Sequence, residues 1–574
     1  MIQNYTFRSI AVAFLFLSLA SNAQKIAIRE YLETENQYHH LSGVVLATGG
    51  DQDVVYLAFG HTDANQKEQN TLETRFDIGS MSKQFTAAAI LDLMDQGKLA
   101  LDQPINSLLG ELGSKRWEKV QVKHLLAHQS GILSLFNTAS PVDVMPSEEA
   151  VPLVTLISYF QDARLDFKPG HAYSYSNSGY VLLAAIIESV SGQPFGDYMN
   201  DFFQRMGLKE TTFGTPATAY AKATFGYLPE HKKEGMQVHP DWMVGAGGVF
   251  STASDLEKWI RLIHSDDFLS SELNQEYLKG HVKKRNGSYG FGWEFLTRED
   301  GDIMWHDGAN FGYVSYIGYQ KSTDRLLIIL TNQTFESITT IGLSADYLST
   351  LQKNIWDLWD GKEIESLPFV QGENSALFTG MTYEFANGEQ LRFTKDCETF
   401  LVETTSGLPV TNMIYNEPLT GEDPRITTLQ KTASFLQKGK NLKLASISNT
   451  TMKIGVYTGI FKWAFGQLTG EGFEAVDSKA YYLGDNYGKI RLIDEGEILD
   501  LRVYFNDDNK VQGIFQDNWY EPLKPESMRA YTTGKGEVVI DGMPYAMPTG
   551  TIRFTSDGLE LTILNRTFLA KAVK

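Results

Sequence analysis

The sequence has very little cysteine. Cys397 is the only one among 574 residues, so no disulfide can form within the chain and no Cys-rich zinc or iron–sulfur site is available. Positive charge is also scarce, since 50 Lys and Arg stand against 70 Asp and Glu, for a formal net charge of −20 at pH 7. An acidic surface repels phosphate groups, so we expect neither a nucleic acid nor an anionic membrane as partner. The expected partner is a small-molecule or peptide substrate, and the oligomeric state is left open.

Long hydrophobic runs are missing as well. The apolar stretch near the N-terminus, 10–19, is too short to span a bilayer comfortably. It follows Arg8 and precedes small residues that end at Ala23, which is the pattern of a cleaved signal peptide covering residues 1–23. An uncleaved membrane anchor is the alternative, and the shortness of the stretch argues against it. We therefore expect a secreted protein, located in a bacterial periplasm, with no stable membrane anchor after cleavage.

The sequence does contain a mixed pattern of strands and helices over residues 26–359. Short β-type runs come near both ends of this region, and helical periodicity lies between them. This order predicts an α+β domain rather than a strict alternation of strand and helix. The expected strands are 44–46, 54–57, 314–319 and 326–331, and the clearest expected helices are 80–97, 180–190 and 254–264.

The chain changes character after a polar stretch, 361–374, which we interpret as a linker. Residues 375–574 show short alternating runs separated by turn residues, as in the hairpin pattern around Asn387-Gly388. Such spacing predicts an all-β C-terminal region of small barrels or sandwiches. A recurring aromatic-Thr-Gly motif predicts two modules in it, at about 375–450 and 451–574.

The stretch from Ser80 to Lys83 is the first that points to chemistry, because it lies where an extended run gives way to a long helical pattern. A lysine three residues after a serine projects from the same face of a helix, one turn along. The amine is then within proton-transfer reach and can activate the serine hydroxyl as a nucleophile without a histidine. The alternative is that Ser80 only caps the helix.

A second motif, Tyr175-Ser176-Asn177, precedes the next expected helix. A phenol beside the ammonium of Lys83 is expected to ionise more easily, because a nearby opposite charge favours the charged form. Tyr175 can then relay a proton between Ser80 and a leaving group, and Asn177 can donate its amide N–H groups to a substrate carbonyl. The alternative is that Tyr175 packs in the interior and Asn177 caps the helix.

A third motif, His306-Asp307-Gly308, lies on or just before the late strands. A glycine there would let a substrate lie close to the strand. The next residue, Ala309, can offer its backbone N–H. Together with the N–H of Ser80 it would form an oxyanion hole, in which each donor typically contributes about 3–4 kcal/mol. The alternative is a turn with a surface histidine.

These motifs and the blocks around them resemble the β-lactamase-related serine hydrolases of the class C type. That family includes class C β-lactamases, some penicillin-binding proteins, D-aminopeptidases and carboxylesterases. The resemblance covers roughly residues 30–355 and implies a β-lactamase/transpeptidase-like domain, with an antiparallel sheet and a helical region. The C-terminal β region resembles the small modules that some relatives carry. The blocks that carry the resemblance are 76–87, 97–102, 125–131, 167–170, 175–180, 206–208 and 247–252.

The resemblance also implies roles for individual residues. Ser80 would be the acylated nucleophile, and Lys83 and Tyr175 would share the work of general base and proton relay, with the division between them left open. No metal and no cofactor is expected. The residues that would bind substrate are Asn177, His306, Gly308 and Ala309.

One motif departs from the family pattern. Class C β-lactamases carry Lys-Thr-Gly where this chain has His306-Asp307-Gly308. The lysine of that motif offers a cation to the carboxylate of the antibiotic, whereas a histidine is mostly neutral at neutral pH. We therefore expect an acyl-enzyme hydrolase acting on esters or on D-amino-acid-containing peptides and amides. Two alternatives stay open: a β-lactamase or penicillin-binding D,D-carboxypeptidase, and a catalytically silent binding protein of the same fold.

Overall fold

The computed structural model describes most of residues 24–364 and a smaller share of the chain beyond them. The chain divides into two compact units, Met1–Ile364 and Glu365–Lys574, and each is described by itself. The predicted signal peptide, Cys397 and most of the predicted linker lie outside the described residues. The undescribed residues of the first unit are 1–23, 37–40, 50–52, 64, 66–67, 136–148, 216–219, 223, 226–232, 235–237, 285–286, 311 and 335–340. In the second unit the description covers 382–385, 388, 390–396, 399–404, 430, 477–484, 487–494, 497–505, 511–520, 528–532, 538–541, 548–555, 558–563 and 566–573.

An antiparallel sheet of eight strands forms the frame of the first unit, in the order β2-β1-β13-β12-β11-β10-β9-β8. The first hairpin pairs with β13, so strands from both ends of the unit are neighbours, with Val45 opposite Ile329. Strand β12 is buried along its whole length, as a continuous apolar run bounded by turns predicts. The strands are β1 (Gly43–Gly49), β2 (Asp53–Phe59), β8 (Val282–Lys284), β9 (Gly287–Tyr289), β10 (Glu294–Leu296), β11 (Ile303–Asn310), β12 (Tyr313–Gln320) and β13 (Arg325–Thr331).

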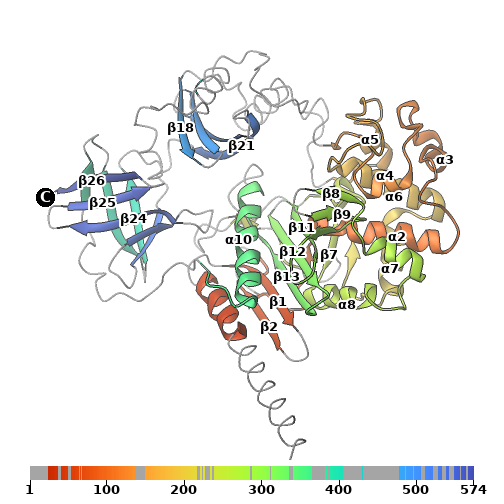
Figure 1. Ribbon diagram of the computed structural model, residues 1–574, viewed down its shortest axis with the longest axis horizontal. Helices are drawn as coiled ribbons and strands as arrows, with labels where there is room; N and C mark the ends of the chain where they lie inside the picture. The colour runs from red at the N-terminus through yellow and green to blue at the C-terminus, as the bar shows by residue number, and fades with distance from the viewer. Residues whose placement is uncertain are drawn as a thin grey trace, which may run out of the picture. The chain divides into compact units, whose positions relative to one another are not determined.

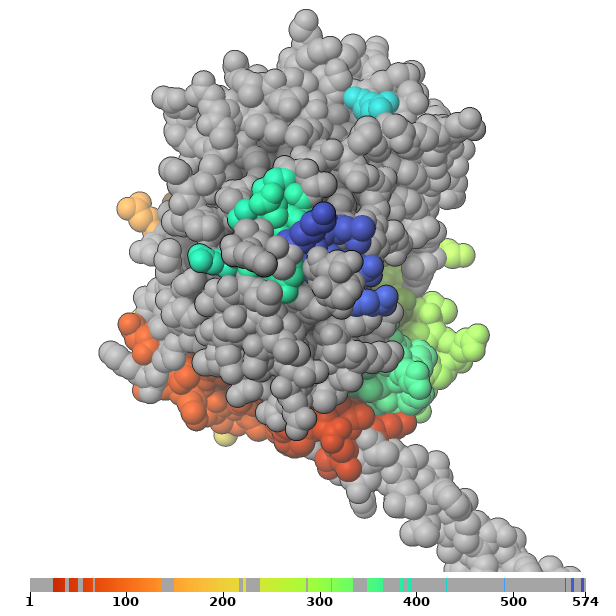
Figure 2. Space-filling view, turned by 90° about the vertical axis from the view of Figure 1, so that its left-hand side faces the viewer, coloured from red at the N-terminus to blue at the C-terminus, as the bar shows by residue number. Residues whose placement is uncertain are grey.

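Helices cover both faces of this sheet (Figure 1). On one face α10 (Ile341–Trp359) contacts β11 and β12, and the helical residues 24–36 lie beside it, where Asn354 Nδ2 donates to the hydroxyl of Tyr31 at 3.1 Å. On the other face α8 (Ala253–Ile263) contacts β1 and β13. Figure 2 shows red and orange segments from the first part of the chain at the surface. Among the described helices, none combines the length and the apolar character needed to cross a membrane.

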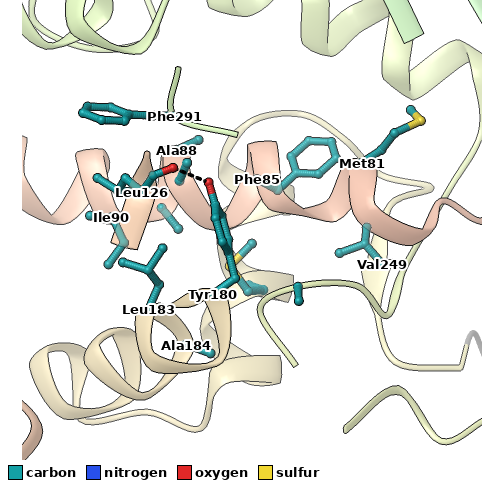
Figure 3. Packing of buried hydrophobic residues seen from close by; sticks show 14 of the residues in the cluster. Met81, Phe85, Ala88, Ile90, Leu126, Tyr180, Leu183, Ala184, Val249 and Phe291 are labelled. Atoms are coloured by element: carbon teal, nitrogen blue, oxygen red, sulfur yellow. Dashed lines mark hydrogen bonds between the residues drawn. The ribbon is translucent and has the colours of Figure 1, made fainter. Parts of the chain in front are cut away.

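The core of the helical region lies between α2 (Ser82–Asp95) and α6 (Asn177–Ser191) (Figure 3). Helix α2 is buried on nearly all sides, and three consecutive alanines, 87–89, leave room for its neighbours to approach. Tyr180 of α6 lies between the helices and donates its hydroxyl to the carbonyl oxygen of Leu126 at 2.9 Å. The start of α2 is therefore fixed by the interior of the unit. The other helices here are α3 (Asn106–Leu109), α4 (Val122–Leu126), α5 (Leu153–Ser158), α7 (Phe195–Arg205) and α9 (Ser271–Tyr277).

Two small three-stranded sheets complete the first unit, and one of them leads into α2. It consists of β3 (Phe76–Asp77), β7 (Val249–Ser251) and β4 (Thr212–Phe213), in the order β3-β7-β4. The other has the order β14-β5-β6, with β14 (Gln333–Thr334), β5 (Thr224–Phe225) and β6 (Lys233–Glu234). The α+β prediction for the first unit is confirmed.

Among the described residues of the second unit, every named element is a strand, as predicted for an all-β region, while Gln430 is helical, and the strands form two sheets. One closes on itself in the order β15-β16-β17-β22-β23-β24-β25-β26, and the other is the four-stranded meander β18-β19-β20-β21. The closed sheet takes strands from both predicted modules, so the division near residue 450 is not the observed one. The strands are β15 (Thr382–Phe385), β16 (Gln390–Asp396), β17 (Thr399–Thr404), β18 (Asp477–Gly484), β19 (Tyr487–Asp494), β20 (Glu497–Phe505), β21 (Val511–Tyr520), β22 (Met528–Thr532), β23 (Val538–Asp541), β24 (Pro548–Thr555), β25 (Gly558–Ile563) and β26 (Arg566–Val573).

Candidate active site

Ser80 lies in a short 3-10 turn, η1 (Gly79–Met81), that leads directly into α2. The α-helix begins at Ser82, and its N-cap is Met81, so the alternative interpretation of Ser80 as a helix cap is wrong. Ser80 remains partly exposed while its neighbours on both sides are buried. A substrate can therefore reach the hydroxyl, and the turn that presents it is held from inside.

The backbone of this turn is tied to two sheets. The N–H of Ile78 donates to the carbonyl oxygen of Val249 at 3.0 Å, and the hydroxyl of Ser315 donates to the carbonyl oxygen of Ile78 at 2.8 Å. The hydroxyl of Ser82 accepts the N–H of Val249 at 3.3 Å, which gives that serine a structural role. Gly79 has φ +52°, a left-handed conformation that favours glycine. These contacts fix the direction in which the turn presents its serine.

Lys83 follows one turn later, and the structure brings its amine to the Ser80 hydroxyl. Nζ of Lys83 lies 3.0 Å from Oγ of Ser80 and 2.7 Å from the carbonyl oxygen of Ala246. The lysine side chain is fully buried, and this burial holds its pKa well below the usual value, although the nearby carboxylate of Asp307 opposes the shift. The lowered pKa favours a neutral amine, which can accept the serine proton.

Tyr175 reaches the same place from the segment before α6. Its hydroxyl forms a hydrogen bond with Ser80, and Nζ of Lys83 lies 4.9 Å from the centre of its ring. Desolvation raises the pKa of Tyr175 well above its usual value, and the charge of Asp307 adds to this effect, although the hydrogen bond from Ser80 opposes it. The prediction that the lysine makes this phenol easier to ionise is therefore wrong, because the burial that lowers the charge of Lys83 also disfavours the phenolate.

Asn177 is the first residue of α6, but it does not cap the helix. The cap is Ser176, whose hydroxyl accepts the N–H of Gly179 at 3.3 Å. The backbone N–H of Asn177 donates to the hydroxyl of Ser134 at 3.2 Å. Within the described part of the chain, its carboxamide has no hydrogen bond to either member of the serine–lysine pair. Its predicted contact with substrate stays a prediction.

His306 lies on β11 and is buried, so the alternative of a surface histidine is wrong. It belongs to a hydrogen-bonded chain of three side chains. The N–H of Ser176 donates to Nδ1 of His128 at 3.1 Å, so the imidazole proton of neutral His128 is on Nε2, which lies 3.1 Å from the hydroxyl of Tyr289. That hydroxyl lies 3.5 Å from Nε2 of His306, whose Nδ1 lies 2.5 Å from the carbonyl oxygen of Asp307. The N–H of His128 is thus donated to the hydroxyl of Tyr289.

Both histidines of this hydrogen-bonded chain, His128 and His306, are held in the neutral form. Burial lowers the pKa of His306 to about 3, and the charge of Lys83 acts in the same direction. Burial and the same lysine also hold the pKa of His128 well below its usual value. The ring of His128 lies 4.3 Å from the ring of Tyr175, centre to centre, so the chain also supports the phenol beside Ser80.

Gly308 and Ala309 face the turn that carries the nucleophile. A Cβ on Gly308 would lie 2.1 Å from the carbonyl oxygen of Ile78, and a Cβ on Gly79 would lie 2.8 Å from the backbone nitrogen of Ala309. The backbone before Ser80 is thus what requires a glycine at 308, and the predicted contact of Gly308 with substrate stays a prediction. Ala309 adjoins the turn as expected, and its part in an oxyanion hole stays a prediction.

Several residues at this site were missed by reasoning from the sequence. His128, Tyr289 and Ala246 belong to none of the three motifs that point to chemistry. Asp77 and Asn310 were passed over as well. The one available signal was the pair of glycines on either side of Tyr289, at 287 and 290, which is too common to decide anything. In the described part of the chain, no group of three or more His, Cys, Asp or Glu side chains could hold a metal ion.

Comparison with protein families agrees with this geometry. The family described as Beta-lactamase matches residues 27–340, which is more than half of the chain. The chain belongs to the beta-lactamase family. This confirms the predicted resemblance and the fold expected from it.

Curated relatives within the beta-lactamase family include proteins of different names. Penicillin-binding protein 4* of Bacillus subtilis strain 168 is 29% identical over 336 residues, which cover 53% of this chain and 71% of the relative. Protein flp of Staphylococcus aureus strain MW2 is 25% identical and is matched over 55% of this chain and 65% of its own length. A beta-lactamase of Escherichia coli strain K12 is 24% identical, over 52% of this chain and 85% of that protein.

Solved structures show the same fold. The D-amino acid amidase of Ochrobactrum anthropi SV3, complexed with L-phenylalanine, aligns with a TM-score of 0.50 at 21% identity, over 59% of this chain and 98% of its own. The octameric penicillin-binding protein homologue of Pyrococcus abyssi aligns with a TM-score of 0.51 at 20% identity, over 86% of this chain and 98% of its own. At this identity both likenesses concern the fold alone.

Proposed function

We propose that the chain is an exported serine hydrolase that cleaves esters, or amides and peptides containing D-amino acids, through an acyl-enzyme on Ser80. The observation that carries the proposal is the 3.0 Å approach of the fully buried Lys83 amine to the partly exposed Ser80 hydroxyl. A buried amine with a lowered pKa is the kind of base that a serine nucleophile needs near neutral pH. Membership of a family of serine hydrolases supports the same reaction class.

The proposed reaction has two halves. Ser80 Oγ attacks the substrate carbonyl while its proton passes to Nζ of Lys83, and the carbonyl oxygen becomes an oxyanion held by the N–H groups of Ser80 and Ala309. The bond to the leaving group then breaks, and the leaving group takes a proton from the hydroxyl of Tyr175, which is replaced from Lys83. Water attacks the acyl-enzyme in the second half, with its proton following the same route in reverse. Hydrolysis returns the serine hydroxyl and releases the acid.

The two shifted pKa values support this division of labour. Burial favours neutral Lys83, which makes the amine the first proton acceptor. Burial also keeps Tyr175 protonated, so the phenol donates to the leaving group in the first half and accepts the water proton in the second only as it passes its own to Lys83. The pair still titrates as one unit, so kinetics will report macroscopic pKa values.

The third motif supports esters and D-amides over β-lactams. His306 is buried with its pKa lowered to about 3, so at neutral pH it offers no cation to a substrate carboxylate. The neighbouring Asp307 side chain is 54% exposed and places a negative charge beside His306. A β-lactam antibiotic carries a carboxylate that such a surface repels. The D-amino acid amidase that shares the fold acts, by its name, on amides of D-amino acids.

A second candidate is a penicillin-binding carboxypeptidase or a β-lactamase. The observation in its favour is the 29% identity with Penicillin-binding protein 4* over 336 residues. The two candidates differ in the charge that they require beside the scissile bond, and this difference can be measured directly with substrates.

The deciding experiment uses the purified protein with a short-chain aryl ester, a D-alanyl anilide and a chromogenic cephalosporin, each beside Ser80→Ala. We expect turnover of the ester or the anilide, its loss in Ser80→Ala, and labelling of Ser80 by a fluorophosphonate. A cephalosporin as best substrate would reverse the ranking of the two candidates. Absence of both turnover and labelling would favour a binding protein of the same fold.

Export is tested separately. The N-terminal pattern of residues 1–23 supports cleavage before Gln24. Expression of the full chain in a bacterium, followed by cell fractionation and N-terminal sequencing, should find a periplasmic protein that begins at Gln24. A cytoplasmic protein that retains Met1 would contradict export.

A further inference from the structure

We propose that Asp77 and Asn310 are positioning residues that set the distance between the two oxyanion donors, the backbone N–H groups of Ser80 and Ala309. This inference rests on the proposed function, because it assigns a task within the same acyl-transfer site. Neither residue touches the reacting atoms in the proposed mechanism. Each acts through the residue next to it in the chain.

The geometry that points to this is a single carboxylate with one oxygen on each side of the donor pair. Oδ1 of Asp77 accepts the backbone N–H of Gly79 at 2.8 Å. Oδ2 of Asp77 accepts the side-chain N–H of Asn310 at 2.7 Å. Gly79 directly precedes Ser80, and Asn310 directly follows Ala309. The carboxylate therefore joins the immediate neighbours of both donors.

The carboxylate of Asp77, bound to Gly79 on one side and to Asn310 on the other, forms a clamp. Its position in the fold explains why it is needed. Asn310 is the last residue of β11 and pairs with Tyr313 of β12, so Ala309 lies one residue before the end of this ladder. The other side-chain tie from the large sheet to the turn, from Ser315, acts at Ile78, two residues before Ser80. Of these ties, the Asp77–Asn310 contact alone spans both neighbours of the proposed hole. It holds a strand end against a 3-10 turn at the point where a small shift would separate the two N–H groups.

The chemistry of the clamp suits a fixed spacer. Both side chains are buried, so the two hydrogen bonds are not exchanged with water. Burial raises the pKa of Asp77 to about 6, while the hydrogen bonds from Gly79 and Asn310 oppose the shift. At neutral pH the group is thus mainly a carboxylate that accepts two charge-assisted hydrogen bonds, which are shorter and stronger than neutral ones.

The test replaces the donor of the clamp and then restores it with the partners exchanged. Asn310→Asp places two carboxylates face to face and should lower kcat for the aryl ester between about tenfold and 10²-fold, with a smaller change in KM. This is less than the roughly 10²–10³-fold loss for removing one oxyanion donor. The double variant Asp77→Asn/Asn310→Asp lets the new amide donate to the new carboxylate and still accept the N–H of Gly79. It should recover most of kcat at unchanged net charge.

A pH profile separates positioning from a general loss of structure. Two facing carboxylates share a proton as the pH falls, because one of their pKa values is raised. The ratio of kcat in Asn310→Asp to kcat in the wild type should therefore rise toward low pH. The matched control is Asp255→Asn, which changes another buried carboxylate that accepts a backbone N–H, from Glu210 at 2.7 Å. It should leave kcat and the shape of the pH profile unchanged.

The outcomes distinguish this inference from the proposed function. If wild-type Ser80 is neither acylated nor labelled by a fluorophosphonate, the proposed function fails and the clamp fails with it. If the wild type turns over and Asn310→Asp is equally fast, the clamp alone is overturned. A double variant that is folded by circular dichroism but as slow as Asn310→Asp also overturns it. Recovery of kcat in the double variant supports the clamp.

Discussion

The amine nitrogen of Lys83 lies 3.0 Å from the hydroxyl oxygen of Ser80, and the lysine side chain has no exposure to solvent. Water would stabilise an ammonium at this position, but the interior of the unit does not. The favoured state of the pair is therefore a neutral amine beside a hydroxyl. This relationship makes the pair ready to transfer a proton before any substrate arrives.

Replacing Lys83 by arginine should abolish most of the activity on an aryl ester. A guanidinium keeps its charge at any accessible pH and cannot accept a proton. A general base typically contributes about 10²–10⁴-fold, so we expect kcat for Lys83→Arg to fall by about 10³-fold. The matched control is Lys258→Arg, at a mostly exposed lysine that pairs with Asp255 on α8. Near-normal burst kinetics in Lys83→Arg would show that another group takes the serine proton.

The lowered pKa of Lys83 predicts how activity and stability depend on pH. In the free enzyme, kcat/KM for a neutral ester should rise with pH as Lys83 loses its proton, and level off well below pH 10.5. Between the lowered pKa and 10.5 the unfolded chain binds more protons than the native state, so the free energy of unfolding also rises with pH. The rise is up to about 1.4 kcal/mol per pH unit.

Urea unfolding of the wild type and of Lys83→Met at pH 7 and pH 9 measures this effect. The methionine variant should lack the rise. Its free energy of unfolding should therefore fall relative to that of the wild type between pH 7 and pH 9. Parallel pH dependences in the two proteins would mean that Lys83 has an ordinary pKa in the native state.

Removing the hydroxyl of Tyr289 should disorder the histidine chain without emptying the core. In Tyr289→Phe, Nε2 of His306 loses its neutral donor, which makes protonation easier and raises the pKa of His306 from about 3. We expect about a tenfold loss of kcat through poorer orientation of Tyr175, which packs on His128. NMR titration of the imidazole and steady-state kinetics check the two effects.

The control for that variant is Tyr198→Phe, which removes another buried phenol hydroxyl, one on α7 that donates to Asp92 at 3.1 Å. It should change neither the titration of His306 nor kcat. If Tyr289→Phe behaves in the same way, the hydrogen-bonded chain has no part in orienting the site.

A methyl group at Gly308 should move the nucleophile. In Gly308→Ala the added carbon would lie 2.1 Å from the carbonyl oxygen of Ile78, so the turn or the strand must shift. We expect a loss of about 1–3 kcal/mol in the free energy of unfolding and a fall in kcat of about 10²-fold. The control is Gly179→Ala in α6, where the nearest atom to the new carbon is 3.6 Å away. Chemical denaturation and ester kinetics measure both, and a Gly308→Ala enzyme of normal rate would contradict the close contact.

Local sequence could predict those parts of the site that covalent geometry alone brings together. Ser80 and Lys83 are three residues apart, and any helical turn places them on one face, whatever surrounds them. Tyr175 and His306 are remote from this pair in the sequence, and their roles beside it could be proposed only through the resemblance to the family. The contact between Asp77 and Asn310 joins positions separated by 233 residues, and neither side chain forms part of a motif with the other.

The errors have physical reasons of the same kind. The direction of the shift at Tyr175 was judged from a neighbouring charge, but burial is the larger effect, and burial is a tertiary property. The glycine at 308 was explained by the close approach of a substrate. The backbone that would contact a side chain there, at Ile78, is remote in sequence. In the second unit, β17 pairs with β22 across more than a hundred residues, which no local alternation of side chains can show.

The burial of α2 makes Ser80 a reporter of folding. The helix that follows the nucleophile is enclosed along almost its entire length, so the amine beside the serine loses its contact with water only after α2 has docked against α6. A fluorophosphonate that reacts at Ser80 would thus count native molecules in a mixed population. Its rate of incorporation during refolding would time the assembly of the interior.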